Sequence, residues 1–204
     1  MTMNNFLNKK NDRISVLLIE ERIKSNSPLR NALVDFNFQI TKQLSFEDNI
    51  IKEIELCNPN ILILATDLPS DKMLKDLAEI NQLLPLPIII FAENDSPNVI
   101  QVAIKSGVSA YVVHEVLPQR INSIISVANE RFKSVQALRD ELKHTKNQLE
   151  GRKYIERAKG YIMQQRQISE HEAYADLRKM AMNQGSPLAT VAKNIIDVCE
   201  LLSA

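Results

Sequence analysis

The sequence predicts an α/β domain built on a five-stranded parallel sheet, followed by one long helix and a small all-α unit of three helices. Three observations predict this order. Five short apolar runs alternate with helical patterns between residues 14 and 118. The stretch 119–150 then keeps apolar residues at a 4-3-4-3 spacing without a proline or a glycine. The remainder of the 204-residue chain carries two further helix starts.

The predicted strands are short runs rich in β-branched and other apolar residues. They cover residues 14–19, 38–44, 61–65, 87–91 and 110–113. Apolar residues at helical spacing separate them, in residues 28–36, 46–57, 72–84 and 97–106, and a further helix begins near Leu117. Because such continuously apolar strands need cover on both faces, the pattern favours a parallel sheet between two layers of helices.

Ligands and reactions in sheets of this kind lie at the carboxyl ends of the strands. The positions there are Glu20–Glu21, Ala65–Asp67, Ala92–Glu93 and His114–Glu115. The acidic pair Glu20 and Glu21 has the ligand type that a cation needs, but an acidic, solvated loop is the better interpretation. A single histidine with no ligand partners, such as His114, indicates a loop side chain rather than a metal site.

The long helix carries a heptad-like apolar stripe, which is interrupted at Arg139 and Lys146. Its members are Ile121, Ile125, Ala128, Phe132, Val135, Leu142 and Leu149. An apolar stripe on a long helix needs a cover, and a second copy of the chain is the simplest one, so we expect a coiled coil in a parallel homodimer. Two alternatives stay open: the stripe packs back on its own domain, or the helix breaks near Gly151.

The C-terminal part continues as helices. Ile155, Ala158 and Ile162 extend the helical pattern beyond residue 151. The pair Ser169 and Glu172 forms a capping box that starts a second helix, and the Gly-Ser-Pro segment 185–187 ends it and starts a third. The predicted domains are therefore an α/β domain at 14–118, a coiled-coil connector at 119–150 and a three-helix unit at 151–204.

The charges are unevenly distributed along the chain, although its formal net charge is zero. Residues 14–130 carry 9 basic against 15 acidic side chains, and residues 131–204 carry 13 against 9. Two basic stripes follow the helix after residue 151: Arg152, Lys159 and Arg166, and beside them Lys153, Arg157, Gly160 and Gln164. Such a surface suits a phosphate backbone, but charge alone favours a solvated face and does not distinguish RNA from DNA.

Composition and motifs exclude several classes of protein. Two distant cysteines, Cys57 and Cys199, cannot build a disulfide scaffold or a zinc site. No apolar run approaches the roughly 20 residues of a membrane span, and the polar start lacks a secretory signal, so we expect a cytoplasmic protein. The sequence shows no phosphate-binding glycine loop, metal-ligand cluster or nucleophile motif, which predicts a non-enzyme without cofactor or metal.

The segments VLLIEE, PNILILATDLP, PLPIIIFAE and KSGVSAYVVHE resemble the receiver domain of bacterial response regulators, which has a flavodoxin-like fold. In that family an acidic pair and an acceptor aspartate hold Mg²⁺, and a Ser/Thr and a Lys bind the phosphoryl group. Here the resemblance aligns these positions with Glu20, Glu21, Ala65, Ala92 and His114. The resemblance therefore implies a pseudo-receiver with a degenerate phosphorylation site. Asp67 lies two residues beyond the acceptor position and outside the motif.

The segments RKYIERAKGYIM, SEHEAY and LRKMAM, followed by Val191–Ala192, resemble the ANTAR domain. The order of parts resembles the AmiR/NasT antitermination regulators, closest to those of the NasT type. The resemblance implies binding to two hairpins in leader RNA, control of nitrate and nitrite assimilation genes, and a nitrate sensor of the periplasmic-binding type that acts without phosphotransfer. The implied RNA contacts are Arg152, Lys153, Arg157, Lys159, Gln164, Arg166, Arg178 and Lys179.

Two other classes remain as alternatives. A DNA-binding response regulator needs a recognition helix, and the last helix, in which Lys193 is the only basic residue, is a poor one. A protein-binding module without RNA affinity would use the basic face for an acidic partner. Tyr161 and Tyr174 offer rings on which a loop base can stack, although Tyr174, beside Ala173, is expected in the core.

Overall fold

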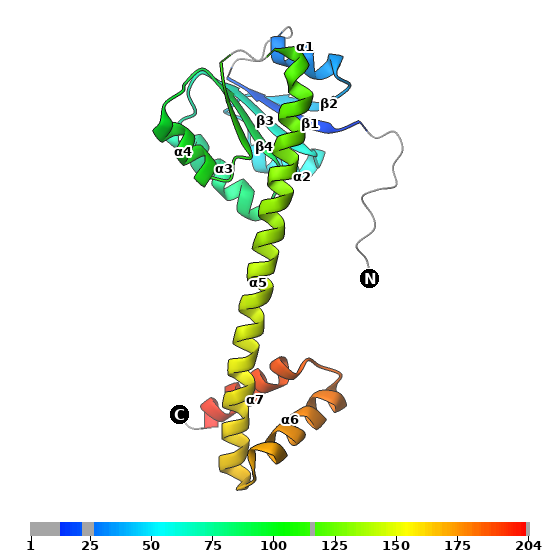
Figure 1. The fold of residues 1–204 in the computed structure, drawn as a ribbon, viewed down its shortest axis with the longest axis vertical. Coiled ribbons are helices and arrows are strands. Elements are labelled where there is room, and N and C mark those ends of the chain that lie inside the picture. Colours follow the sequence, from blue (N-terminus) through cyan, green and yellow to red (C-terminus); the bar gives the residue numbers. More distant parts are fainter. Residues whose placement is uncertain (1–12, 22–26, 115–116, 203–204) are drawn as a thin grey trace. The chain divides into compact units, whose positions relative to one another are not determined.

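The computed structural model describes residues 13–21, 27–114 and 117–202. The chain divides into two compact units, residues 1–135 and residues 136–204, here called the N-terminal and C-terminal units. The division falls inside the connector predicted at 119–150. The helices and strands of each unit can be followed in the ribbon drawing of Figure 1.

The N-terminal unit contains the predicted parallel sheet, with the strand order β2-β1-β3-β4-β5. The strands are β1 (Ser15–Glu20), β2 (Gln39–Leu44), β3 (Ile61–Thr66), β4 (Ile88–Ala92) and β5 (Ala110–Val113). The helices between them are α1 (Pro28–Asp35), α2 (Ile50–Cys57), α3 (Asp71–Leu83) and α4 (Pro97–Lys105). The short 3₁₀ helix η1 (Pro118–Arg120) leads into α5 (Ile121–Arg166). The predicted fold class is confirmed.

Two apolar cores cover the two faces of this sheet, because alternate residues of each strand point to opposite sides. One core joins strand residues such as Leu17 and Leu62 to helices α2, α3 and α4. The other joins Val16 and Ile63 to α1 and to the first turns of α5. The apolar residues of the central strands β1, β3 and β4 are mostly buried, which explains why these strands appear as apolar runs in the sequence.

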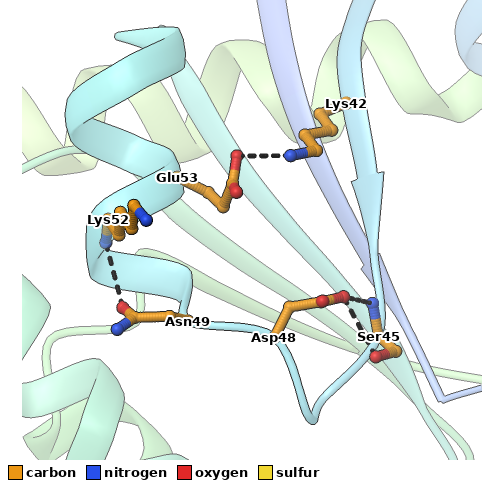
Figure 2. A network of polar contacts seen from close by, with 6 residues as sticks. All are labelled: Lys42, Ser45, Asp48, Asn49, Lys52 and Glu53. Atoms are coloured by element: carbon orange, nitrogen blue, oxygen red, sulfur yellow. Dashed lines mark hydrogen bonds and ion pairs between the residues drawn. The ribbon is translucent and has the colours of Figure 1, made fainter.

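The edge strand β2 is tied to α2 by a polar network, shown in Figure 2. The Lys42 ammonium lies 2.7 Å from a carboxylate oxygen of Glu53. Asn49 caps α2 by accepting a hydrogen bond from the backbone N–H of Lys52, and Asp48 accepts hydrogen bonds from the backbone N–H and hydroxyl of Ser45. These contacts join the turn between β2 and α2 to both elements, so we interpret the network as structural.

The first three residues of the predicted dimer stripe belong to the core of the N-terminal unit. Ile121, Ile125 and Ala128 are each at most 2% exposed and pack against the sheet of their own chain. The expectation that they lie on an intermolecular stripe is therefore wrong. The physical reason is that a helix covering a sheet and a helix in a coiled coil present apolar residues at nearly the same spacing. Phe132 is half-buried, and the later stripe residues are exposed: Val135, Leu142 and Leu149.

The C-terminal unit consists of the end of α5, α6 (Glu170–Gln184) and α7 (Leu188–Leu202). Helix α5 continues through Gly151 without a break, which rules out that alternative. The capping box of Ser169 and Glu172 is confirmed, and Gly185 ends α6 with a φ of 58°, a left-handed conformation that favours glycine. A single apolar core joins the three helices through residues such as Ala158, Leu177 and Val191.

Two further sequence features can be placed in the fold. Cys57 is half-buried in the N-terminal unit and Cys199 is buried in the C-terminal unit, and no disulfide joins either of them to a described residue. None of the helices within the described ranges combines the length and the apolar character that a membrane span requires.

Candidate nucleic-acid interface

The five positions of the degenerate phosphorylation site lie together at the carboxyl edge of the sheet. The strand register sets Glu20 beside Ala65, and a backbone hydrogen bond of 2.9 Å from His114 to the carbonyl of Ala92 fixes the other side. Glu20, Glu21, Ala65, Ala92 and His114 all line one pocket of about 660 Å³. The described residues that the sequence places at the ends of strands β1, β3, β4 and β5 thus line one pocket, and Glu115 lies outside the described residues.

The side chains at these five positions differ in chemistry and in exposure. Ala65 and Ala92 offer only methyl groups to the pocket. Glu20 is 5% exposed, and its carboxylate accepts a hydrogen bond from the Gln43 side-chain amide. His114 is exposed, with Nδ1 3.7 Å from a carboxylate oxygen of Glu93. Within the described ranges, no group of three His, Cys, Asp or Glu side chains is arranged to hold a metal ion.

The basic residues of the C-terminal unit form the second candidate site, and Lys159 departs most from its expected place. Its residue exposure is 7%, and its ammonium lies 2.6 Å from Glu170 and 2.9 Å from Glu156. Hydrogen bonds to Glu170 and then Glu156 raise the pKa of this lysine. The expectation of an exposed Lys159 is therefore wrong, because α6 folds over its alkyl chain and supplies a carboxylate.

Arg157 and Arg166 also bind carboxylates, although both remain more than half exposed. Arg157 donates to Glu200 on α7 at 2.6 Å, and Arg166 donates to Asp176 on α6 at the same distance. The contact with Glu200 is the largest cause that raises the pKa of Arg157. Together with Lys159, these ion pairs connect α5 to both other helices, so part of the predicted basic surface is paired with carboxylates within the unit.

The remaining predicted contacts are exposed. Gln164 lies open on α5, and four cations form no ion pair with any of the described residues: Arg152 and Lys153 on α5, and Arg178 and Lys179 on α6. Charges left without a carboxylate neighbour are the ones best able to contact phosphate, since nothing must be displaced first. Among the predicted contacts, the cations without an ion pair to a described residue thus lie on two helices, Arg152 and Lys153 on α5 and Arg178 and Lys179 on α6.

The expectation that Tyr174 on α6 lies in the core is wrong. Tyr174 is 42% exposed rather than buried in the core, and Met182 is 72% exposed. Positions 174, 178 and 182 follow one another at intervals of four, so these two side chains flank Arg178 on one face of the helix. An exposed phenol ring beside an unpaired guanidinium is a surface on which an unpaired base can stack.

Comparisons with known proteins agree with this division of the chain. Residues 143–196 match the ANTAR domain model. The chain is 23% identical over 182 residues to the transcriptional regulatory protein PdtaR of Mycobacterium tuberculosis strain H37Rv, covering 89% of both chains. It is 31% identical over 75 residues to a nitrate regulatory protein of Klebsiella oxytoca, which is 37% of this chain and 19% of that protein.

A solved structure supports the fold of the N-terminal unit. The signal receiver domain of a modulated diguanylate cyclase from Desulfovibrio desulfuricans G20 has a TM-score of 0.50 at 17% identity, with 60% of this chain and 98% of that chain covered. At this level the similarity shows the fold alone. The fold and the sequence similarities together support an ANTAR-type response regulator, with a receiver-like domain first and the ANTAR match at residues 143–196.

Proposed function

We propose that this protein is an RNA-binding transcription antiterminator that recognises two hairpins in a leader RNA and keeps a terminator from forming. The observation that carries the proposal is the match of residues 143–196 to the ANTAR domain, in a unit whose helices present exposed, unpaired cations. Arg152, Lys153, Arg178 and Lys179 are the residues we expect to contact phosphate first. Gln164 is an exposed polar side chain on α5 that we expect to reach a base edge.

The three ion-paired residues, Arg157, Lys159 and Arg166, are expected to contribute less to RNA binding than the unpaired cations. Arg157 and Arg166 each keep exposed N–H groups, so a phosphate can bind them while the carboxylate contact persists. Lys159 has no such exposed surface. We therefore assign Lys159 to the internal structure of the unit and keep Arg157 and Arg166 as secondary RNA contacts.

We propose that α5 pairs with its copy in a parallel homodimer through the exposed part of its apolar stripe. Val135, Leu142 and Leu149 are at least 40% exposed, and Leu138 is exposed beside them. Leu138 and Leu142 restore the alternating three- and four-residue spacing of a coiled coil at the point where Arg139 appeared to interrupt it. A dimer carries two RNA-binding units, so binding of the first hairpin raises the effective concentration for the second.

The input signal in this proposal is a protein partner rather than phosphorylation. Ala65, Ala92 and His114 leave the pocket of the N-terminal unit without the groups of a working receiver. The similarity to a nitrate regulatory protein favours nitrate-responsive genes as the target. We propose nitrate and nitrite assimilation genes, with a nitrate-sensing protein of the periplasmic-binding type as the partner. Such a partner would hold the protein inactive by covering the receiver-like domain or α5.

The test is binding of the full-length protein to a two-hairpin leader RNA, with a one-hairpin RNA and duplex DNA as competitors, across a salt series. The proposal predicts tight two-hairpin binding, weaker one-hairpin binding and poor competition by DNA. The logarithm of the affinity should fall linearly with the logarithm of the salt concentration. Equal competition by duplex DNA would instead support a DNA-binding regulator, and no affinity for either nucleic acid would support a protein-binding module.

A further inference from the structure

Gly160 occupies a position in α5 where the fold itself gives no reason for a glycine. It lies within the continuous helix Ile121–Arg166, is exposed, and adopts ordinary helical backbone geometry. Glycine is the least favourable helix residue after proline, because it loses the most backbone freedom on folding. A helix that keeps a glycine at such a position loses stability that an alanine would provide.

Packing within the unit explains the other glycine of this helix, Gly151. A Cβ placed on Gly151 would lie 3.1 Å from the Cβ of Ala189, so the close approach of α7 accounts for that glycine. A Cβ placed on Gly160 would meet no atom within 4 Å. An alanine therefore fits at position 160 without any contact, and packing within the chain does not explain why the side chain is missing.

The residues around Gly160 indicate what approaches this surface. At 3.6 residues per turn, Lys153, Arg157 and Gln164 share its side of the helix, and all three are exposed. The buried residues Ala158 and Ile162, which pack against α6 and α7, point the other way. Gly160 thus lies open between two cations and an amide, on the side of α5 turned away from the core of its unit.

We propose that Gly160 is the point at which the RNA backbone comes into direct contact with the backbone of α5. This inference rests on the proposed RNA-binding function and adds a contact that depends on the absence of a side chain. The missing Cβ lets ribose or phosphate atoms lie against the helix backbone, where Lys153 and Arg157 neutralise the phosphate charge and Gln164 offers hydrogen bonds. A second copy of the chain is a poorer occupant, because symmetric pairing here would bring the cations of the two helices together.

The experiment compares Gly160→Ala and Gly160→Leu with the wild type in full-length protein. Both substitutions favour the helix, so the melting temperature of the C-terminal unit should rise, by roughly 4 °C for alanine. Affinity for the two-hairpin RNA should nevertheless fall, by about tenfold for alanine and further for leucine. Asn194→Ala is the matched control, because it improves helix propensity at an exposed position of α7 and should leave RNA affinity unchanged.

Three outcomes would overturn the inference, and they are distinguishable. If the wild type binds the two-hairpin RNA and both Gly160 variants bind it equally well, the contact is wrong while the proposed function stands. If light scattering shows that the Gly160 variants lose the dimer, the glycine serves a contact between two copies. If the wild type itself has no affinity for hairpin RNA, the proposed function fails and this contact fails with it.

Discussion

Replacement of Lys159 by alanine separates a structural role for this residue from an RNA-binding role. The lysine side chain is 9% exposed, so the substitution removes about three buried methylene groups beyond Cβ, at about 0.8 kcal/mol each. This predicts a loss of about 2 kcal/mol in the free energy of unfolding of the C-terminal unit. The two ion pairs add little to this figure, because Glu156 and Glu170 are each 67% exposed and remain solvated without their partner.

Lys159→Met is the matched control, since it keeps most of the buried aliphatic chain and removes only the charge. The assay is thermal unfolding followed by circular dichroism at 222 nm, together with hydrogen exchange to localise the change to α5 and α6. A loss of about 2 kcal/mol corresponds to a fall in melting temperature of roughly 10 °C in a unit of this size. For methionine the fall should be less than half as large. An alanine variant that melts like the wild type but loses RNA affinity would refute the structural role.

Three further predictions concern charge, pH and pairing. Lys153→Ala and Arg178→Ala should each weaken RNA binding and reduce the salt slope by about one, measured by fluorescence anisotropy; an unchanged slope would remove that residue from the interface. Lys159 lowers the pKa of Glu170 and Ser169 lowers that of Glu172, so their stabilisation is present above the usual pKa of 4.5 and is lost as the pH falls through the lowered values. Melting curves of the wild type should therefore show the C-terminal unit losing stability below about pH 4.5, and Glu172→Gln should make that loss shallower; equal pH profiles would contradict this. Leu142→Lys, at a position 71% exposed, should convert the dimer to a monomer in light scattering and lower two-hairpin affinity to the one-hairpin level, and an intact dimer would contradict the proposed pairing.

The fold was predictable because four of the five strands, β1, β3, β4 and β5, are short apolar runs, whereas the edge strand β2 is more polar and gives a weaker signal. The strands β1 and β3 need no partner information to be recognised, since their residues are buried on both faces. The positions at their carboxyl ends follow from topology, which is why Glu20 and Ala65 were correctly expected in one pocket. The capping box at Ser169 is a local signal of the same kind.

The candidate interface was less predictable because the exposure of a charge depends on partners that are distant in the sequence. Lys159 is paired with a carboxylate 11 residues away, and Arg157 with one 43 residues away. A stripe of basic residues at heptad spacing cannot show which of its members another helix will cover. Ile121 illustrates the same limit for the apolar stripe, because periodicity fixes the face of a helix and does not identify what packs against it.

The central proposal, that the protein prevents termination by binding two hairpins, is tested most directly by transcription in vitro. The template should carry a two-hairpin leader followed by a terminator, and the readout is the fraction of transcripts that extend past the terminator as full-length protein is added. We expect read-through to rise with protein concentration and to stay at the basal level when one hairpin is deleted. With Arg178→Ala protein, the same read-through should need a higher protein concentration. Read-through that does not change with wild-type protein, although the RNA is bound, would contradict the account.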